Sequence, residues 1–132
     1  MTVYEMVNPG WKWKPTYTFS PAVRAGNLLF ISGMTATDEN GRIVGEGDIK
    51  AQTRYIYQKM AAILASVGAT CDNVVQTVEY IVTTEGYRET AEVRREFFKN
   101  GFPAATGVIV KGLLSRGALI EIQAVAVLEG AP

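Results

Sequence analysis

The sequence predicts one α+β domain, residues 1–132, in which two helices pack on one face of a mixed β-sheet. Three observations predict it. Strand-like and helix-like patterns follow one another in the order β-β-α-β-α-β-β. Apolar residues make up 48% of the chain and charged residues 20%, which is typical of a globular protein. The length of 132 residues suits a single domain, and no repeat or linker divides the chain.

A β-hairpin opens the pattern, with strands expected at Ala22–Ala25 and Leu28–Ser32. Gly26 and Asn27 are expected to form its turn, because both residues accommodate positive φ. The polar segment Asp38–Gly41 then predicts an exposed turn.

The next element is a helix over Ile49–Val67, which Asp48 caps at its N-terminus and Gly68 ends. Apolar residues at helical spacing mark the face that packs on the sheet: Ile56, Met60, Ile63, Leu64 and Val67. A β-branched strand is expected at Val74–Val82.

A second helix is predicted over Arg88–Lys99, with Gly101 and Pro103 ending it. Strands at Thr106–Val110 and Leu119–Leu128 complete the domain.

The last strand carries an acidic residue, Glu121, within an otherwise apolar run. Alternation places two sets of residues on opposite faces: Ile120, Ile122, Ala124 and Ala126 on one, and Leu119, Glu121, Gln123, Val125 and Val127 on the other. The first face suits a core. A core does not tolerate an unpaired carboxylate, so the second face is expected to meet a subunit interface or a ligand cleft.

Charge and composition argue against several classes of function. Thirteen basic and thirteen acidic residues cancel, without a Lys/Arg block, so neither nucleic acid nor a membrane surface is expected as a partner. No signal-like N-terminus is present, and no apolar stretch approaches the ~20 residues of a membrane span. The single cysteine, Cys71, fits a reducing compartment, and the cytoplasm is the expected location.

The chain contains no histidine, which excludes Ser-His-Asp and Cys-His nucleophiles. With one cysteine as well, no conventional zinc site can be assembled within the chain. No GxGxxG or Walker loop predicts a nucleotide cofactor. We therefore expect no metal and no cofactor, and any catalysis must use carboxylates, hydroxyls, backbone amides, Lys/Arg and ordered water.

Motifs follow one another along nearly the whole chain: Val7-Asn8-Pro9, residues 20–33, Phe97-Phe98, Phe102–Val108, Gly112-Leu113 and Leu119–Val127. In these motifs and their spacing the chain resembles the RidA/YjgF family of enamine/imine deaminases. The resemblance implies a chorismate-mutase-like (ferredoxin-like) subunit, a homotrimer, and ligand clefts between neighbouring subunits. The sheet pattern agrees, because the chain has no further element to cover the second face of its sheet.

The resemblance also assigns site residues. Glu121 matches a cleft glutamate that orients water or shuttles a proton; the alternative is a structural glutamate at the trimer contact. Ser32 and Gly33 match a pair that binds an anionic or carbonyl oxygen; the alternative is a strand end followed by a turn. Phe19 stands where relatives often have tyrosine and keeps the ring wall, unless it is a core residue.

Ala105 is the main departure from the family pattern. Relatives have an arginine there, which grips the carboxylate of 2-iminopropionate or 2-aminoacrylate through a bidentate pair. Alanine supplies no donor, and the neighbouring Thr106 supplies only a hydroxyl. Lys111 and Arg94 are possible substitutes, but both are expected to be solvated surface charges. Ala91 also falls where relatives often have asparagine, so another polar contact is absent. Because Ala105 replaces the arginine, a substrate other than 2-iminopropionate is expected.

Trp11 and Trp13 lie in a Pro-flanked segment that is expected to be extended. They could roof a cleft or stack on a planar ligand, but covering a subunit seam is the favoured interpretation. Alternating Trp and Lys is weak evidence for binding single-stranded nucleic acid.

The leading hypothesis is a RidA-like hydrolase for a small enamine, imine or related unsaturated carbonyl compound. The alternative is a non-catalytic small-molecule-binding or interaction module on the same trimeric scaffold. A ribonuclease or translation inhibitor, activities also ascribed to relatives, is disfavoured by the zero net charge and the absence of histidine.

Overall fold

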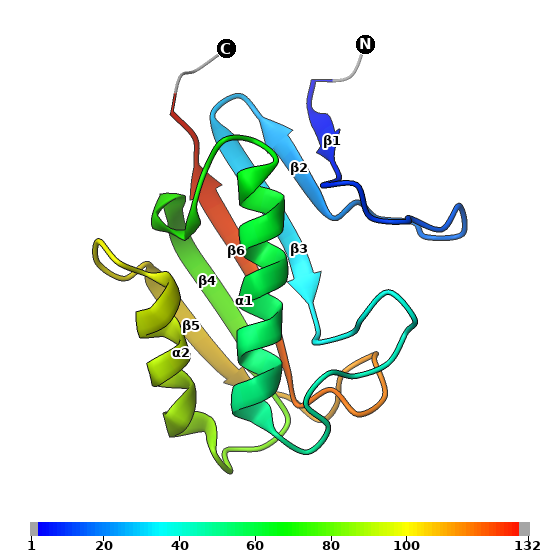
Figure 1. Cartoon of the computed structure of the whole chain (residues 1–132), viewed down its shortest axis with the longest axis vertical. Helices are drawn as coiled ribbons and strands as arrows, with labels where there is room; N and C mark the ends of the chain where they lie inside the picture. The colour runs from blue at the N-terminus through cyan, green and yellow to red at the C-terminus, as the bar shows by residue number, and fades with distance from the viewer. Residues whose placement is uncertain (1–2, 130–132) are drawn as a thin grey trace.

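The computed structural model of the chain describes residues 3–129. Its strands are β1 (Glu5–Val7), β2 (Ala22–Ala25), β3 (Leu28–Met34), β4 (Val74–Ile81), β5 (Ala104–Ile109) and β6 (Ile120–Val127). They form one sheet in the order β1-β2-β3-β6-β4-β5, in which only the β4–β5 pair is parallel. Helices α1 (Ile49–Ala65) and α2 (Thr90–Phe97) lie on one face of the sheet (Figure 1). The predicted α+β class and mixed sheet are confirmed.

Strand β1 is the one strand that the sequence does not predict. It has three residues, Glu5, Met6 and Val7, which pair antiparallel with β2 at the edge of the sheet. So short a segment shows no alternation, and its pairing with β2 defines it.

The hairpin turn is confirmed, with Gly26 at φ 63°. No described non-glycine residue has positive φ, so Asn27 does not share this conformation. Strand β3 runs two residues beyond the predicted end at Ser32, because a bulge carries it to Met34. Ile31 pairs with Ala124 and Met34 with Ile122, so two residues of β3 lie opposite a single residue of β6.

Both predicted helices are present with shifted ends. The Asp48 carboxylate accepts a hydrogen bond from the Ala51 N–H at 3.1 Å, which confirms the predicted cap of α1. The helix ends two residues before Val67, and Gly68 follows at φ 76°. Helix α2 is shorter than the predicted Arg88–Lys99, because η2 (Tyr87–Glu89) is a 3₁₀ turn and Phe98 is already extended.

The core lies between the helices and the sheet, and β6 shows the predicted alternation. Its helix-facing residues are buried: Ile120, Ile122, Ala124 and Ala126. The opposite face carries Leu28, Phe30 and Val127, which are 36%, 44% and 37% exposed. No helix of the described residues covers that face (Figure 1). Within residues 3–129, no helix is both long and apolar enough to cross a membrane.

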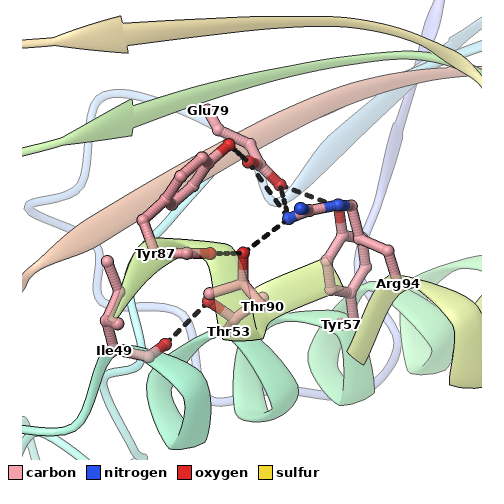
Figure 2. A network of polar contacts seen from close by, with 7 residues as sticks. All are labelled: Ile49, Thr53, Tyr57, Glu79, Tyr87, Thr90 and Arg94. Atoms are coloured by element: carbon pink, nitrogen blue, oxygen red, sulfur yellow. Dashed lines mark hydrogen bonds and ion pairs between the residues drawn. The ribbon is translucent and has the colours of Figure 1, made fainter. Parts of the chain in front are cut away.

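A buried carboxylate, Glu79 on β4, anchors a polar network between the sheet and the helices (Figure 2). Glu79 is only 3% exposed. The hydroxyl of Tyr57 on α1 donates to Oε2 at 3.2 Å, and the hydroxyl of Tyr87 donates to Oε1. Arg94 on α2 forms an ion pair with Glu79, with Nη1 3.3 Å from Oε2. The network thereby ties β4 to both helices.

Arg94 is therefore not the solvated surface charge that the sequence suggests. Its guanidinium also donates to the Thr90 hydroxyl at 2.8 Å, and its side chain is 21% exposed. Burial and the hydrogen bond to Glu79 raise the pKa of Tyr87 to about 12, so this phenol stays protonated and donates. Lys111, the other candidate substitute, is exposed as expected.

Candidate functional site

Glu121 and Gly33 meet where β6 passes the bulge of β3. A methyl group placed on Gly33 would lie 3.2 Å from Cδ of Glu121 and closer still to Oε2. The carboxylate therefore rests on the backbone of β3, in space that only a glycine leaves open. The bulge brings Ser32 to the same place, so three of the predicted site residues lie together.

Glu121 is half-buried, and burial raises the pKa of its carboxyl above the ordinary value. Among residues 3–129, no hydrogen bond or ion pair holds this carboxylate. Glu79 is the opposite case, because its carboxylate is bound by two tyrosines and an arginine. A half-buried carboxyl with unused hydrogen-bonding capacity can hold water and exchange a proton with it.

Ser32 is engaged with the backbone of the preceding segment. Its hydroxyl donates to the Ser20 carbonyl at 2.6 Å, and its N–H donates to the Pro21 carbonyl at 3.0 Å. The Ser32 oxygen can still accept a hydrogen bond, but its proton is used within the chain. Ser32 thus fixes the segment that carries Phe19, whose side chain is 53% exposed and is not a core residue.

Ala105 and Thr106 lie on β5, two strands away from β6 in the sheet. This separation is roughly 10 Å across the strands. Ala105 pairs with Thr77 of β4, which is buried on the helix side of the sheet. Thr106 pairs with Val78 of β4, and Val78 in turn pairs with Gln123 of β6. Thr106 therefore lies on the uncovered face together with Gln123. One chain therefore does not bring Ala105 to Glu121. A cleft that contains both residues requires a second copy.

Tyr80 is a polar neighbour of Glu121 that sequence reasoning missed. The two residues pair across β4 and β6, and the Tyr80 hydroxyl donates to Oε1 of Gln123 at 2.9 Å. Together with Thr106 they form a polar strip on the uncovered face, beside the apolar end at Leu28. Alternation along Val74–Val82 places Tyr80 and Glu79 on opposite faces of the sheet, and this pattern would have indicated the polar strip.

Neither a metal site nor the single cysteine offers an alternative catalytic group in the described part of the chain. Within the described part of the chain, no group of three His, Cys, Asp or Glu side chains could hold a metal ion. Cys71 is buried, and burial raises the pKa of its thiol to about 11, so it is a poor nucleophile at neutral pH.

Fold and site together define a small α+β protein whose uncovered sheet face carries a half-buried carboxylate without a partner among residues 3–129. A family model described as endoribonuclease L-PSP matches residues 12–128. The chain belongs to this family, which is the RidA/YjgF family that its motifs resemble.

Similar proteins span nearly the same length. A RutC family protein of Pyrococcus horikoshii is 35% identical to this chain, and the aligned region covers 86% of this chain and 89% of the relative. The 3-aminoacrylate deaminase RutC of Acinetobacter baylyi is 33% identical to this chain, and the aligned region covers 92% of this chain and 96% of the relative. The crystal structure of a YjgF/YER057c/UK114 family member from Mycobacterium tuberculosis is 33% identical, with a TM-score of 0.79 and coverages of 95% and 99%.

Proposed function

We propose that this protein is a cytoplasmic RidA-like hydrolase that acts on a small enamine or imine. Its active site is a cleft between the copies of a homotrimer, and Glu121 is the catalytic residue. The observation that carries the proposal is the state of this carboxyl, which is half-buried, has a raised pKa and lacks a partner among residues 3–129. Perturbed carboxyls of this kind are concentrated at functional sites.

The reaction needs one carboxyl and one water molecule. The enamine first tautomerises to the imine. Glu121 takes a proton from the water as the water oxygen bonds to the imine carbon, and it passes this proton to the nitrogen, which gives a carbinolamine. The carboxylate then carries the proton of the new hydroxyl to the nitrogen. The C–N bond breaks with its electron pair going to nitrogen, so ammonia leaves and a carbonyl compound remains. Backbone N–H groups near the Ser32–Gly33 bulge are candidates to stabilise the developing charge.

The uncovered sheet face supports the homotrimer. Leu28, Phe30 and Val127 form an apolar surface beside the polar strip at Glu121, and exposed apolar patches of this kind mark interaction sites. Pairing this face with a second copy would cover the apolar end. It would also bring residues of another subunit, including those of β5, towards Glu121.

The substrate is proposed to differ from 2-iminopropionate. The relative named as a deaminase of 3-aminoacrylate acts on an enamine that bears a carboxylate. In this chain Ala105 offers no donor to such a group. A hydrogen bond to a charged group is worth about 1.5–3 kcal/mol, so its loss weakens carboxylate binding roughly tenfold to a hundredfold.

A non-catalytic binding module remains the alternative, because the same cleft can hold a ligand without turning it over. The family model's description names an endoribonuclease. Net charge of zero and the absence of histidine do not favour that activity for this chain.

The test is ammonia release from imines that a flavin amine oxidase generates in place, measured above the spontaneous rate. We expect the wild type to accelerate hydrolysis and Glu121→Gln to abolish the acceleration while keeping fold and oligomeric mass. Glu39→Gln, in the exposed turn, is the matched control and should retain full activity. Full activity of Glu121→Gln on the same imine would refute the catalytic role. Binding without turnover in the wild type would establish the binding module instead.

A further inference from the structure

The segment between β1 and β2 is fixed at both ends, although it contains neither helix nor strand. At its start, Oδ1 of Asn8 accepts from the Trp11 N–H at 2.8 Å, and Trp11 packs against the core with the Lys59 ammonium over its ring. At its end, the Ser32 hydroxyl holds the Ser20 carbonyl. In Figure 1 the segment extends beyond the β1 edge of the sheet.

Three aromatic side chains gather in this segment: Trp13, Tyr17 and Phe19, which we call the aromatic arm. Tyr17 and Phe19 stack with centroids 5.6 Å apart and planes at 28°. Trp13 stands edge-on to both, at 74° and 79°, and its Nε1 donates to the Phe19 carbonyl at 2.6 Å. Tyr17 and Phe19 remain 41% and 53% exposed. The arm thus keeps part of two aromatic residues open to a ligand, and exposed aromatic surface of this kind suits contact with a planar group.

The arm is joined to the Glu121 site by short covalent and hydrogen-bonded links. Phe19 is followed by Ser20, whose carbonyl is bonded to Ser32, and Ser32 is followed by Gly33. The Glu121 carboxylate lies on Gly33. The end of the aromatic arm is therefore anchored to the part of β3 on which the Glu121 carboxylate lies.

The charges near this surface restrict the ligand. Lys14 already lies over the Tyr17 ring, with its ammonium 5.8 Å from the centroid, so a cationic ligand would meet a resident cation. No cation of the described residues pairs with Glu121, and burial alone accounts for its raised pKa. Ala105 adds no charge. An uncharged planar group meets none of these obstacles.

We infer that the aromatic arm makes the protein selective for imines or enamines whose double bond is conjugated with a planar, uncharged substituent such as an aryl ring. The arm binds the substituent while Glu121 acts on the C=N carbon. This inference rests on the proposed function and adds its substrate class. Removing one aromatic contact should weaken binding roughly two- to tenfold.

Binding tests the inference independently of turnover. Isothermal titration calorimetry compares benzamide, cyclohexanecarboxamide and benzoate, which separate flatness from charge. We expect benzamide to bind at least about tenfold more tightly than the other two. In Tyr17→Leu/Phe19→Leu this preference should disappear, whereas Tyr4→Ala, an exposed aromatic outside the arm, should keep it. Equal affinities, undetectable binding, or an unchanged preference in the double variant would overturn the inference. Tighter binding of benzoate would assign the arm to an acidic ligand through Lys14 and overturn it as well.

Turnover separates this inference from the proposed function. With a flavin amine oxidase as the imine source, benzylamine and pentylamine give an aryl and an alkyl imine. We expect the double variant to raise KM for the aryl imine by a larger factor than KM for the alkyl imine; an equal change for both imines would overturn the inference. If the variant instead loses its oligomeric mass, the arm covers a subunit seam and the inference is wrong. Benzamide selectivity without hydrolysis of either imine would sink the proposed function and leave the arm's selectivity standing.

Discussion

Arg94→Met is expected to destabilise the protein by breaking the ion pair with Glu79. The Glu79 side chain is 4% exposed, and its counter-ion lies 3.3 Å away with 21% of its side chain exposed. Removing one partner of a buried pair costs about 3–5 kcal/mol, because the other charge stays buried. Two tyrosine hydroxyls still donate to Glu79, and Arg94 is partly solvated, so we expect the lower end, about 3 kcal/mol.

Urea unfolding at a fixed protein concentration measures this change. With a slope of about 2 kcal/mol per molar, the midpoint should fall by roughly 1.5 M. Arg95→Met is the matched control, since Arg95 is the next residue on α2 and is exposed; its effect should stay within about 0.5 kcal/mol.

A second substitution identifies the mechanism. In the Arg94→Met background, Glu79→Gln removes the buried charge; its amide oxygen can accept from one tyrosine hydroxyl, and its NH2 can donate to the oxygen of the other. We expect the double variant to be more stable than Arg94→Met alone. If Arg94→Met is as stable as Arg95→Met, or if Glu79→Gln destabilises it further, the ion pair does not have the role described.

Three further predictions concern the site. Gly33→Ala should keep the fold and lower turnover at least about tenfold, because the new methyl displaces the Glu121 carboxylate; kcat and melting temperature together check it. A raised folded-state pKa favours the neutral carboxyl of Glu121, so its contribution to stability is fully present below the unfolded pKa of about 4.3 and is lost as pH rises through the folded value. Glu121→Gln should lack this loss. Urea unfolding at acid and at neutral pH would therefore show a smaller fall in the free energy of unfolding for Glu121→Gln than for the wild type. An equal fall in both proteins would contradict the prediction. Ala105→Arg should raise kcat/KM for 2-iminopropionate about tenfold, and no gain would show that position 105 does not meet the substrate.

Much of the fold could be predicted because the apolar periods are clear. Val74–Val82 and Leu119–Leu128 show strand patterns, and the apolar stripe of Ile49–Val67 together with Asp48 and Gly68 defines a capped helix. The errors lie at element ends. The start of the predicted second helix is the 3₁₀ turn Tyr87–Glu89, and Phe98 near its predicted end is extended and buried in the core, where it is 4% exposed. Tertiary packing decides such ends.

The site was predictable in its residue types and less so in its arrangement. Glu121 in an apolar strand was visible, and its position beside Gly33 follows from the register of β3 and β6. The bulge that creates this contact depends on a pairing between distant segments. No local pattern shows that Ala105 lies exposed on β5 at the edge of the sheet, two strands away from Glu121.

Glu79 shows what periodicity can reveal when it is applied to every strand. Thr77, Glu79 and Ile81 alternate onto the buried face, as the apolar residues of β6 do. A carboxylate on that face required a partner, and Arg94 is the cation that α2 places there. Periodicity in the sequence predicts that Glu79 needs a counter-ion, but only the packing of α2 on the sheet shows that this counter-ion is Arg94.

Subunit mixing tests most directly whether Glu121 works in a cleft between copies. Glu121→Gln removes the carboxyl, and Thr106→Trp obstructs the part of the cleft that β5 is proposed to supply. If each cleft takes Glu121 from one copy and Thr106 from another, random exchange of two inactive variants leaves about one cleft in four with both residues intact, so about a quarter of wild-type activity should return. Failure to recover activity after exchange has been verified by mass would contradict a site shared between subunits.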